Sequence, residues 1–361
     1  MKKSTKLVIA VVVIIIIVLI VVQSSTQKTK ISIGAVVPQT GFGAYWGKPE
    51  LNGIKLAEMD LKKEYGENNV SIFIEDGQSA IPASVSAAQK LLSVNKVDLI
   101  YSEFSGPSAA ISPVVKNAGK TFVYSTFNQK IADDNERSIK TFVSFEVACE
   151  KFAKDLNDSS KKVLIISSIG DVAPYCERAL LKVLPKENVK TVDGFIGTDF
   201  RTLLLQNKSF APDYIIPVMY EDGSFALIKQ KVELGLKSNI FGYRQDSMTE
   251  KILKDLPVAY TEGIVFFEMP IDKGFNQRIK TAYPEMTDDD IQAAANAYQS
   301  MMAAGVALAQ CPGADSACVV SKISDIKDFE FAGYQNASFV NRILTSDLSF
   351  GVVKNGVAVV E

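Results

Sequence analysis

Short runs of β-branched residues alternate with amphipathic stretches along most of this 361-residue chain. The runs have the length and composition of strands buried in a parallel sheet, and the stretches between them repeat apolar residues at helical spacing. The expected strands are Ile31–Val37, Val70–Ile74, Val97–Tyr101, Thr121–Tyr124, Lys162–Ser167, Val189–Phe195, Asp213–Val218, Asn239–Gly242 and Gly263–Phe267. This alternation predicts an α/β protein with helix-covered, mainly parallel sheets, and argues against a sandwich or a bundle.

The expected helices and one hairpin complete this pattern. Amphipathic stretches cover Leu51–Leu61, Val85–Leu92, Ala179–Val183 and Phe225–Leu234. The longest expected helix, Asp288–Gln310, follows Thr287 as a cap and carries three Asp in its first turn, where negative charge favours the helix dipole. Near the end of the chain, Asn355-Gly356 between Phe350–Val353 and Val357–Val360 predicts a hairpin on a type I′ turn.

Composition limits the possible functions. Hydrophobic residues make up 47% and charged residues 22%, which is typical of a folding chain, and roughly 150 residues per domain predicts about two domains. Lys+Arg 39 against Asp+Glu 41 gives a net charge of −2, so no basic excess favours nucleic acid as a partner. Because the chain has no His, His-based triads and His-ligated zinc or haem are excluded, and we expect no metal and no cofactor.

The amino terminus predicts export. Lys2, Lys3 and Lys6 precede an unbroken apolar run over residues 7–22, and polar residues follow it. Basic residues stay on the cytoplasmic side, so the chain after residue 26 is expected outside the membrane. As a helix the run spans about 24 Å, shorter than a bilayer core of roughly 30 Å. We favour a retained anchor over a cleaved signal peptide because no Ala-x-Ala site follows.

The four cysteines fit an oxidising location, where an even number of thiols can pair. Cys311 and Cys318 enclose a turn-rich segment, which favours a small closed loop between two helices. Cys149 and Cys176 then form the second pair, although burial as free small apolar side chains remains an alternative for those two.

Candidate binding residues follow the expected strands, because ligands of parallel α/β sheets bind at the carboxyl ends of strands. The Gly-rich loop after the first strand holds Tyr45 and the sole Trp, Trp46. Ser105 and Gly106 open a helix after the third strand, where free N–H groups and the dipole favour an anion. Thr126 and Asn128 follow the fourth strand. The alternatives are packing of the aromatic rings under the loop and ordinary helix capping.

The second half of the chain supplies the facing candidates. Asp171 and Tyr175 follow one expected strand, Tyr220 follows another, and Arg244 and Asp246 follow a third. Glu221, Asp222 and Asp246 also raise the alternative of an extracytoplasmic enzyme with a carboxylate pair, although no spacing makes that pair specific.

Several motifs occur in an order that resembles a known family. They are Ile31-Ser32-Ile33-Gly34 with Pro38-Gln39-Thr40-Gly41, Trp46-Gly47 with Asn52-Gly53 and Ala57, Ile74-Glu75-Asp76, and Gly197-Thr198-Asp199-Phe200 with Ala211-Pro212-Asp213. With them the chain resembles the substrate-binding proteins of branched-chain amino-acid ABC transporters, the leucine/isoleucine/valine-binding class of type I periplasmic binding proteins. The resemblance spans most of the exported region.

The resemblance implies two doubly wound, Rossmann-like lobes that close over a ligand about a three-crossing hinge. Lobe 1 would comprise residues 27–143 and 268–332, and lobe 2 residues 144–267 and 333–361. The crossings would fall near Phe142–Phe145, Phe266–Met269 and Phe331–Gln335. In amino-acid binders of this family, a first-lobe hydroxyl and backbone amides take the carboxylate, and an acid on the second lobe takes the ammonium.

The ligand remains open at this stage because Arg244 lies at or beside the expected acid and Asp246 follows two residues later. If Arg244 faces the cleft, its guanidinium favours a second anionic group, as in a dicarboxylate. If Asp246 does, an amino acid is favoured. We therefore predict a non-enzymatic solute-binding protein for an amino acid or organic anion, delivering to an ABC permease. The alternatives are a sensory ectodomain and the carboxylate enzyme.

Overall fold

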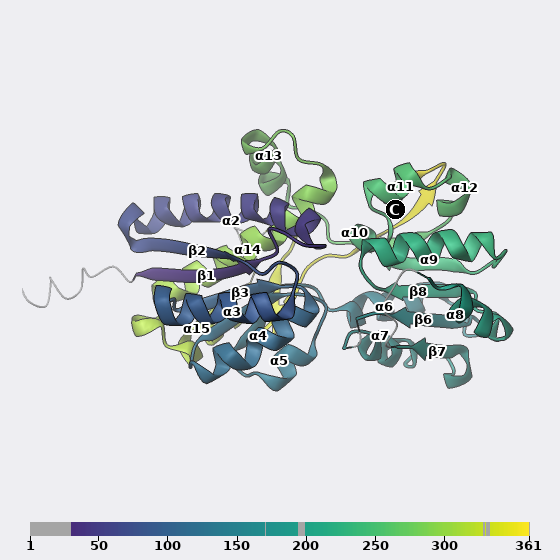
Figure 1. Ribbon diagram of the computed structural model, residues 1–361, viewed down its shortest axis with the longest axis horizontal. Coiled ribbons are helices and arrows are strands. Elements are labelled where there is room, and N and C mark those ends of the chain that lie inside the picture. The colour runs from purple at the N-terminus through teal and green to yellow at the C-terminus, as the bar shows by residue number, and fades with distance from the viewer. Residues whose placement is uncertain (1–29, 170, 194–198, 328, 330–332, 361) are drawn as a thin grey trace, which may run out of the picture.

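The structure, a computed structural model, describes residues 30–360 except 170, 194–198, 328 and 330–332. Two lobes lie side by side, each built on a seven-stranded sheet (Figure 1). The predicted anchor, residues 7–22, lies outside the described residues. Within those residues, no helix combines the length and apolar character needed to cross a membrane.

The first sheet has the strand order β11-β12-β5-β4-β3-β1-β2. Its strands are β1 Ile31–Val37, β2 Val70–Asp76, β3 Leu99–Glu103, β4 Thr121–Ser125, β5 Ser138–Lys140, β11 Ser338–Val340 and β12 Ile343–Thr345. All neighbouring strands pair in parallel except β11 and β12, which form an antiparallel pair at one edge.

Helices cover both faces of this sheet. Those on one face are α2 Ala44–Tyr65, α14 Asp288–Gln310 and α15 Ser316–Ser324, and those on the other are α3 Ile81–Lys90, α4 Ser105–Asn117 and α5 Lys130–Asp134. Helix α13, Lys273–Ala282, precedes α14. Helices α2 and α14 pack so closely that a Cβ at Gly53 would collide with the carbonyl oxygen of Ala294. The expected Thr287 cap of α14 is confirmed, since Thr287 and Asp290 form a capping box.

The second sheet has the strand order β14-β13-β10-β9-β8-β6-β7. Its strands are β6 Val163–Ser167, β7 Val189–Val192, β8 Tyr214–Val218, β9 Asn239–Tyr243, β10 Val265–Glu268, β13 Ser349–Lys354 and β14 Val357–Val360. One face packs on α6 Phe145–Leu156 and α7 Ala173–Leu180, and the other on α8 Arg201–Gln206, α9 Glu221–Glu233, α11 Glu250–Asp255 and α12 Val258–Thr261. The short helix α10, Arg244–Ser247, follows β9 directly.

The two sheets repeat one topology. The order β2-β1-β3-β4-β5 in the first matches β7-β6-β8-β9-β10 in the second, and each sheet then gains two strands from the end of the chain. The strand order therefore reverses beside β1 in the first lobe and beside β6 in the second, and such switch points are where doubly wound sheets bind ligands. The predicted fold of two doubly wound lobes is confirmed.

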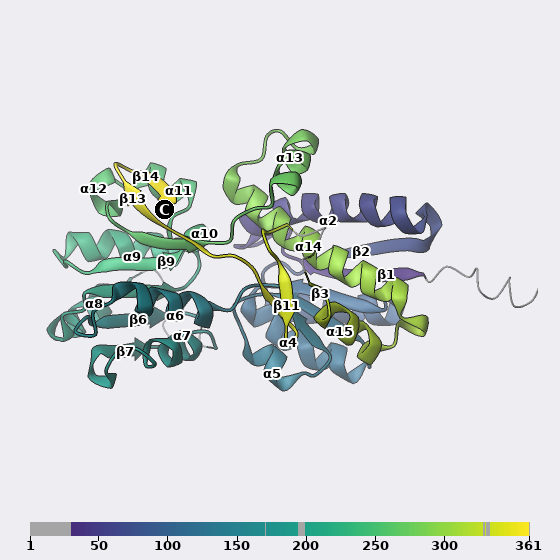
Figure 2. The same ribbon diagram turned by 180° about the vertical axis from the view of Figure 1, so that it is seen from behind.

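Sequence reasoning located the long strands but missed the short ones. Strands β5, β11 and β12 were not expected, and residues 194–195 of one predicted strand lie outside the described residues. Residues 333–361 were all expected in the second lobe, but β11 and β12 pair within the first sheet. The last crossing consequently runs through residues 346–348 rather than Phe331–Gln335, and Figure 2 shows this segment passing from β11 toward β13. These strands are three residues long, and β11 and β12 join the first sheet only because β12 pairs with β5, which is far away in the sequence.

A buried lysine stabilises the first crossing, which spans residues 141–144 between β5 and α6. Lys140 is fully buried, and its Nζ donates hydrogen bonds to the carbonyl oxygens of Phe142 and Val143, the latter at 2.7 Å. Burial lowers the pKa of Lys140 well below its usual range. The second crossing spans residues 269–272, between β10 and α13.

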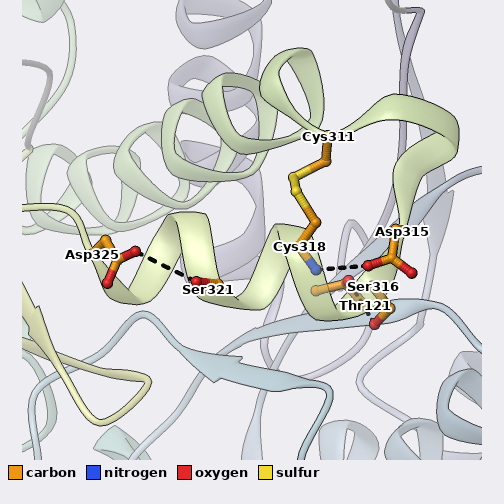
Figure 3. Close-up of a disulfide and its surroundings, with 7 residues drawn as sticks. All are labelled: Thr121, Cys311, Asp315, Ser316, Cys318, Ser321 and Asp325. Atoms are coloured by element: carbon orange, nitrogen blue, oxygen red, sulfur yellow. Dashed lines mark hydrogen bonds between the residues drawn. A yellow bond between two sulfur atoms is a disulfide. The ribbon is translucent and has the colours of Figure 1, made fainter.

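Both favoured disulfides form. Cys149–Cys176 joins α6 to α7, and Cys311–Cys318 joins the end of α14 to the first turn of α15. Figure 3 shows the second disulfide beside Asp315, whose carboxylate accepts a 2.8 Å hydrogen bond from the N–H of Cys318 and so caps α15.

Candidate functional site

A small cavity lies between the lobes at the carboxyl ends of strands from both sheets. It is lined by Tyr45, Trp46, Glu103, Phe104, Ser105, Ser125, Thr126, Phe127, Phe142, Ile169, Tyr220, Tyr243, Asp246 and Asn296. Its volume is about 60 Å³, whereas roughly 10–15 Å³ is enough for one water molecule. The space therefore suits a small solute and not a polymer.

The Gly-rich loop after β1 brings the first two aromatic side chains to this cavity. The loop is held by Asp76, at the end of β2, whose carboxylate accepts hydrogen bonds from the Gln39 N–H at 3.0 Å and the Thr40 hydroxyl at 2.6 Å. Although burial raises the pKa of Asp76, these hydrogen bonds lower it overall. Helix α2 then starts at Ala44, so that Tyr45 and Trp46 lie in its first turn and line the cavity as predicted.

The junction of β3 and α4 contributes Glu103, a buried acid at the end of β3, as well as the predicted Ser105. Phe104 takes a left-handed backbone conformation, with φ of 62°, and so connects the strand to the helix in a single residue. Helix α4 begins at Ser105, which lines the cavity, whereas Gly106 is exposed and does not. Pro107 is the third residue of the helix.

After β4 the chain turns Thr126 inward and Asn128 away. The Thr126 hydroxyl lines the cavity and accepts a 2.9 Å hydrogen bond from the N–H of Asn128. The Asn128 amide instead donates a 3.4 Å hydrogen bond to Asp171 of the other lobe, outside the cavity. This hydrogen bond forms a turn within the loop and not the helix cap expected as the alternative, because α5 begins at Lys130 and has no side-chain cap.

A buried polar cluster underlies the first-lobe wall of the cavity. Glu50 of α2, Glu103 of β3 and Asn296 of α14 are at most 2% exposed, and Glu50 accepts a 3.1 Å hydrogen bond from the hydroxyl of Tyr101. Burial raises the pKa of Glu50 to about 7. Burial, and next the charge of Glu50, raises the pKa of Glu103 well above its usual range. The two carboxyl groups thus hold a proton between them at neutral pH.

On the second lobe, Asp246 rather than Arg244 lines the cavity. Arg244 Nη1 donates to the Glu268 carboxylate at 2.6 Å, in an ion pair outside the cavity lining. Burial, followed by the charge of Glu221, raises the pKa of Asp246 to about 8. The charge of Asp246 in turn contributes, after burial, to raising the pKa of Tyr45 across the cavity and of Tyr220 beside it.

The structure thus brings part of the predicted set together. The predicted residues that line the cavity are Tyr45, Trp46, Ser105, Thr126, Tyr220 and Asp246, and those that do not are Gly106, Asn128, Asp171, Tyr175 and Arg244. Tyr175 reaches the other lobe elsewhere, through a 2.8 Å hydrogen bond to Asp133. Loops after strands of both sheets thus reach the cavity, but the sequence did not show which side chains of each loop face it.

Sequence reasoning missed the lining residues that belong to regular elements or to the hinge. They are Glu103, Phe104, Ser125, Phe127, Phe142, Ile169, Tyr243 and Asn296. One signal was available, because Glu103 ends an otherwise apolar strand, and an acid there needs a partner. Asn296 on the long apolar helix α14 gave a similar but weaker signal.

The structure separates the three acids that were considered for an enzyme. Glu221 and Asp222 both accept hydrogen bonds from Lys251, at 3.1 and 3.0 Å. Asp246 lines the cavity. No group of three or more potential metal-ligating side chains occurs in the described part of the chain.

Comparisons with known proteins agree with this architecture. The model of the family described as "Periplasmic binding protein" matches residues 30–356. The chain therefore belongs to the periplasmic binding protein family, whose members bind solutes outside the cytoplasm and are not enzymes. No curated protein sequence matches the chain.

Solved structures of the same fold include binders of different solutes. The leucine-binding protein LivK of Thermotoga maritima has a TM-score of 0.76 at 19% identity, covering 92% of this chain and 97% of that chain. A solute-binding protein of R. palustris in complex with 4-hydroxybenzoate has a TM-score of 0.73 at 20% identity, with 92% and 95% covered. LivJ of Streptococcus pneumoniae in complex with isoleucine has a TM-score of 0.73 at 18% identity, with 91% and 97% covered. This chain is thus a member of the periplasmic binding protein family with the type I fold of these structures.

Proposed function

We propose that the chain captures an amino acid in the cavity between its lobes and delivers it to an ABC permease. Asp246 binds the α-ammonium group. Ser105 and Thr126 bind the α-carboxylate, which also gains from the dipole at the N-terminus of α4. Tyr45, Trp46 and Tyr220 pack against the rest of the ligand, as expected of a small-molecule site with a few polar groups among apolar walls.

One observation carries the proposal: Asp246 lines the cavity, whereas Arg244 is paired with Glu268 outside the lining. A guanidinium in the cavity would favour a second anionic group, but the acid favours an ammonium. Ser105 and Thr126, on the facing lobe, are 7% and 6% exposed. Opposite ends of a zwitterion thus have complementary partners on opposite lobes, so ligand binding favours closure. Leucine and isoleucine are named for two proteins of the same fold.

The proposal is tested by binding measurements on the full chain in mild detergent. We expect at least one of the common L-amino acids to bind saturably and to raise the melting temperature, because a ligand bound only to the native state stabilises it. At a concentration of 100 times Kd the stabilisation is about 2.7 kcal/mol. Organic acids without an amino group, such as 4-hydroxybenzoate, are expected to bind more weakly. The proposal is wrong if no amino acid binds, or if organic acids bind best.

We also propose that residues 7–22 remain as a membrane anchor that holds the binding lobes at the outer face of the membrane. The uniformly apolar sequence and the missing Ala-x-Ala site support retention. Mass spectrometry of the native protein tests this, because retention predicts a chain that still contains residues 7–22 and that stays with the membrane fraction. A mature chain beginning near Gln23 would contradict it.

A further inference from the structure

The first-lobe wall of the cavity contains more hydrogen-bond acceptors than the described residues satisfy. We call Glu50, Glu103 and Asn296 the acceptor floor. Both carboxyl oxygens of Glu103, Oε2 of Glu50 and Oδ1 of Asn296 are buried and accept no hydrogen bond from a neighbouring donor group. The proton that Glu50 and Glu103 share joins one oxygen of each, which leaves the other oxygen of Glu103 and Oδ1 of Asn296 as open acceptors. Each unsatisfied buried polar atom costs about 1–3 kcal/mol. Glu103 and Asn296 line the cavity directly, so a bound molecule can reach the floor.

The surroundings of the acceptor floor supply no cation. The charged residues that line the cavity are Glu103 and Asp246, both acids, and no Lys or Arg is among the lining residues. On the second lobe, Arg244 pairs with Glu268, and Lys251 pairs with Glu221 and Asp222. Lys48, two residues before Glu50, is exposed. Because the pKa values of Glu50 and Glu103 are both raised, the floor carries at most one negative charge near neutral pH, and a single cation on the ligand would stabilise that charge.

The walls beside the floor suit the apolar stem that would carry such a cation. Trp46, Phe104, Phe127, Phe142, Tyr220 and Tyr243 contribute aromatic surface to the cavity. The rings of Phe127 and Tyr243 meet edge to face with centroids 5.2 Å apart, so they form a continuous apolar wall. Aromatic faces pack well against methylene groups and attract ammonium and guanidinium groups.

From these observations we infer that the ligand is an amino acid with a basic side chain, whose distal nitrogen binds the acceptor floor. The inference rests on the proposed function, in which Asp246 and the Ser105–Thr126 side of the cavity bind the amino-acid head group. Glu103 is then the residue that determines specificity. A neutral side chain would leave the floor unsatisfied, and a second carboxylate would face Glu103.

Isothermal titration of the full chain with matched amino acids tests the inference without any variant. L-lysine and L-norleucine share the same straight side chain except for the terminal amine, and L-ornithine and L-arginine vary its length and shape. Sites built to hydrogen-bond a polar group reject analogues without it by large factors. We expect the best basic amino acid to bind at least about 100-fold more tightly than L-norleucine, L-leucine or L-glutamate.

Glu103→Gln then tests which residue provides this preference. It removes the charge but keeps the shape, and we expect it to weaken the basic ligand at least about tenfold while leaving L-norleucine unchanged or tighter. Glu75→Gln is the matched control, because Glu75 lies next to the last residue of β2 in the same sheet but pairs with Lys90 at the surface, 2.7 Å away. This control is expected to change neither affinity.

The outcomes separate the two proposals. Tightest binding of leucine, norleucine or glutamate would overturn the inference and leave the proposed function standing. Binding of a basic amino acid that Glu103→Gln does not weaken would also overturn it. If no amino acid binds and only 4-hydroxybenzoate does, both proposals are wrong.

Discussion

The hydroxyl of Tyr175, in the second lobe, donates a 2.8 Å hydrogen bond to the carboxylate of Asp133 in the first. A second contact between the lobes joins the N–H of Glu250 to Asp289 at 2.8 Å. The ring of Tyr220 also packs against Phe104 across the mouth of the cavity, with centroids 5.1 Å apart. The lobes are therefore in contact on several sides of the cavity, and a ligand can leave only after such contacts separate.

Tyr175→Phe is expected to speed ligand release. The variant removes one partly exposed, charge-assisted hydrogen bond between the lobes, which is worth about 0.5–1.5 kcal/mol, so the dissociation rate should rise about twofold to tenfold. Stopped-flow fluorescence can follow this, because the sole Trp, Trp46, lines the cavity. Tyr260→Phe, in α12 of the second lobe, is the control and should release ligand at the wild-type rate. An unchanged rate in Tyr175→Phe would mean that this contact does not restrain opening.

The charge of Asp246 predicts a pH dependence of binding. Burial and the charge of Glu221 raise the pKa of Asp246 to about 8, so in the ligand-free protein the group is protonated at pH 6 and 7. An ammonium requires the ionised form, so binding releases a proton and affinity should increase with pH up to about 8, by at most about tenfold per pH unit. Calorimetry in buffers of different ionisation enthalpy measures the released proton directly.

Asp246→Asn separates this group from the others that face the cavity. Glu50 and Glu103 also face the cavity with raised pKa values, so a part of the pH dependence should survive in the variant. Tyr45 and Tyr220 stay protonated over this range because their pKa values are raised above that of a free tyrosine. The variant should bind the amino acid at least about tenfold more weakly at pH 8, and binding should release fewer protons than in the wild type. Equal proton release from both proteins would contradict the role of Asp246.

The raised pKa of Asp246 also determines whether this residue makes the protein more or less stable as the pH rises. A carboxyl group whose pKa is higher in the folded than in the unfolded chain makes the folded state bind more protons, so the free energy of unfolding falls as pH rises from about 4 to about 8. Asp246→Asn lacks this contribution. Without ligand, its stability relative to wild type should therefore increase over that pH range, as measured by urea unfolding at several pH values. A constant difference would show that Asp246 titrates normally.

Local patterns accounted for much of the fold but only for part of the site. The hairpin β13–β14 was predictable because its turn residues, Asn355 and Gly356, both adopt the positive φ that a type I′ turn requires. Strand β5 was not, since its register depends on pairing with β4 and β12. For the site, strand order explains why loops after strands of both sheets reach the cavity. Which of Arg244 and Asp246 faces the cavity depends instead on the short helix α10, which turns the two side chains apart.

The buried ion pair of Arg244 and Glu268 is expected to stabilise the second lobe and not to select the ligand's charge. The two side chains are 20% and 11% exposed, and removal of one partner leaves a largely buried charge alone. Arg244→Gln should therefore lower the free energy of unfolding by about 1–3 kcal/mol, and Arg244→Gln with Glu268→Gln should recover part of that loss. The preference for amines over carboxylates should persist in both variants. Reversal of this preference would indicate that Arg244 lies in the binding site.

The two disulfides are expected to differ in their contribution to stability because they close loops of different length. Cys149 and Cys176 are 27 residues apart, and Cys311 and Cys318 are 7 apart. In the chain-entropy model, the longer loop gives about 3.6 kcal/mol and the shorter about 2.4 kcal/mol. Replacing each pair by Ala should therefore lower the free energy of unfolding more for Cys149 and Cys176, as measured with guanidinium chloride.

The variant without either pair serves as the control: its loss should equal the sum of the two, since the pairs lie in different lobes. A larger loss at Cys311 and Cys318 would mean that the disulfide acts mainly on the native contacts of α15, such as the Asp315 cap, rather than on the unfolded chain.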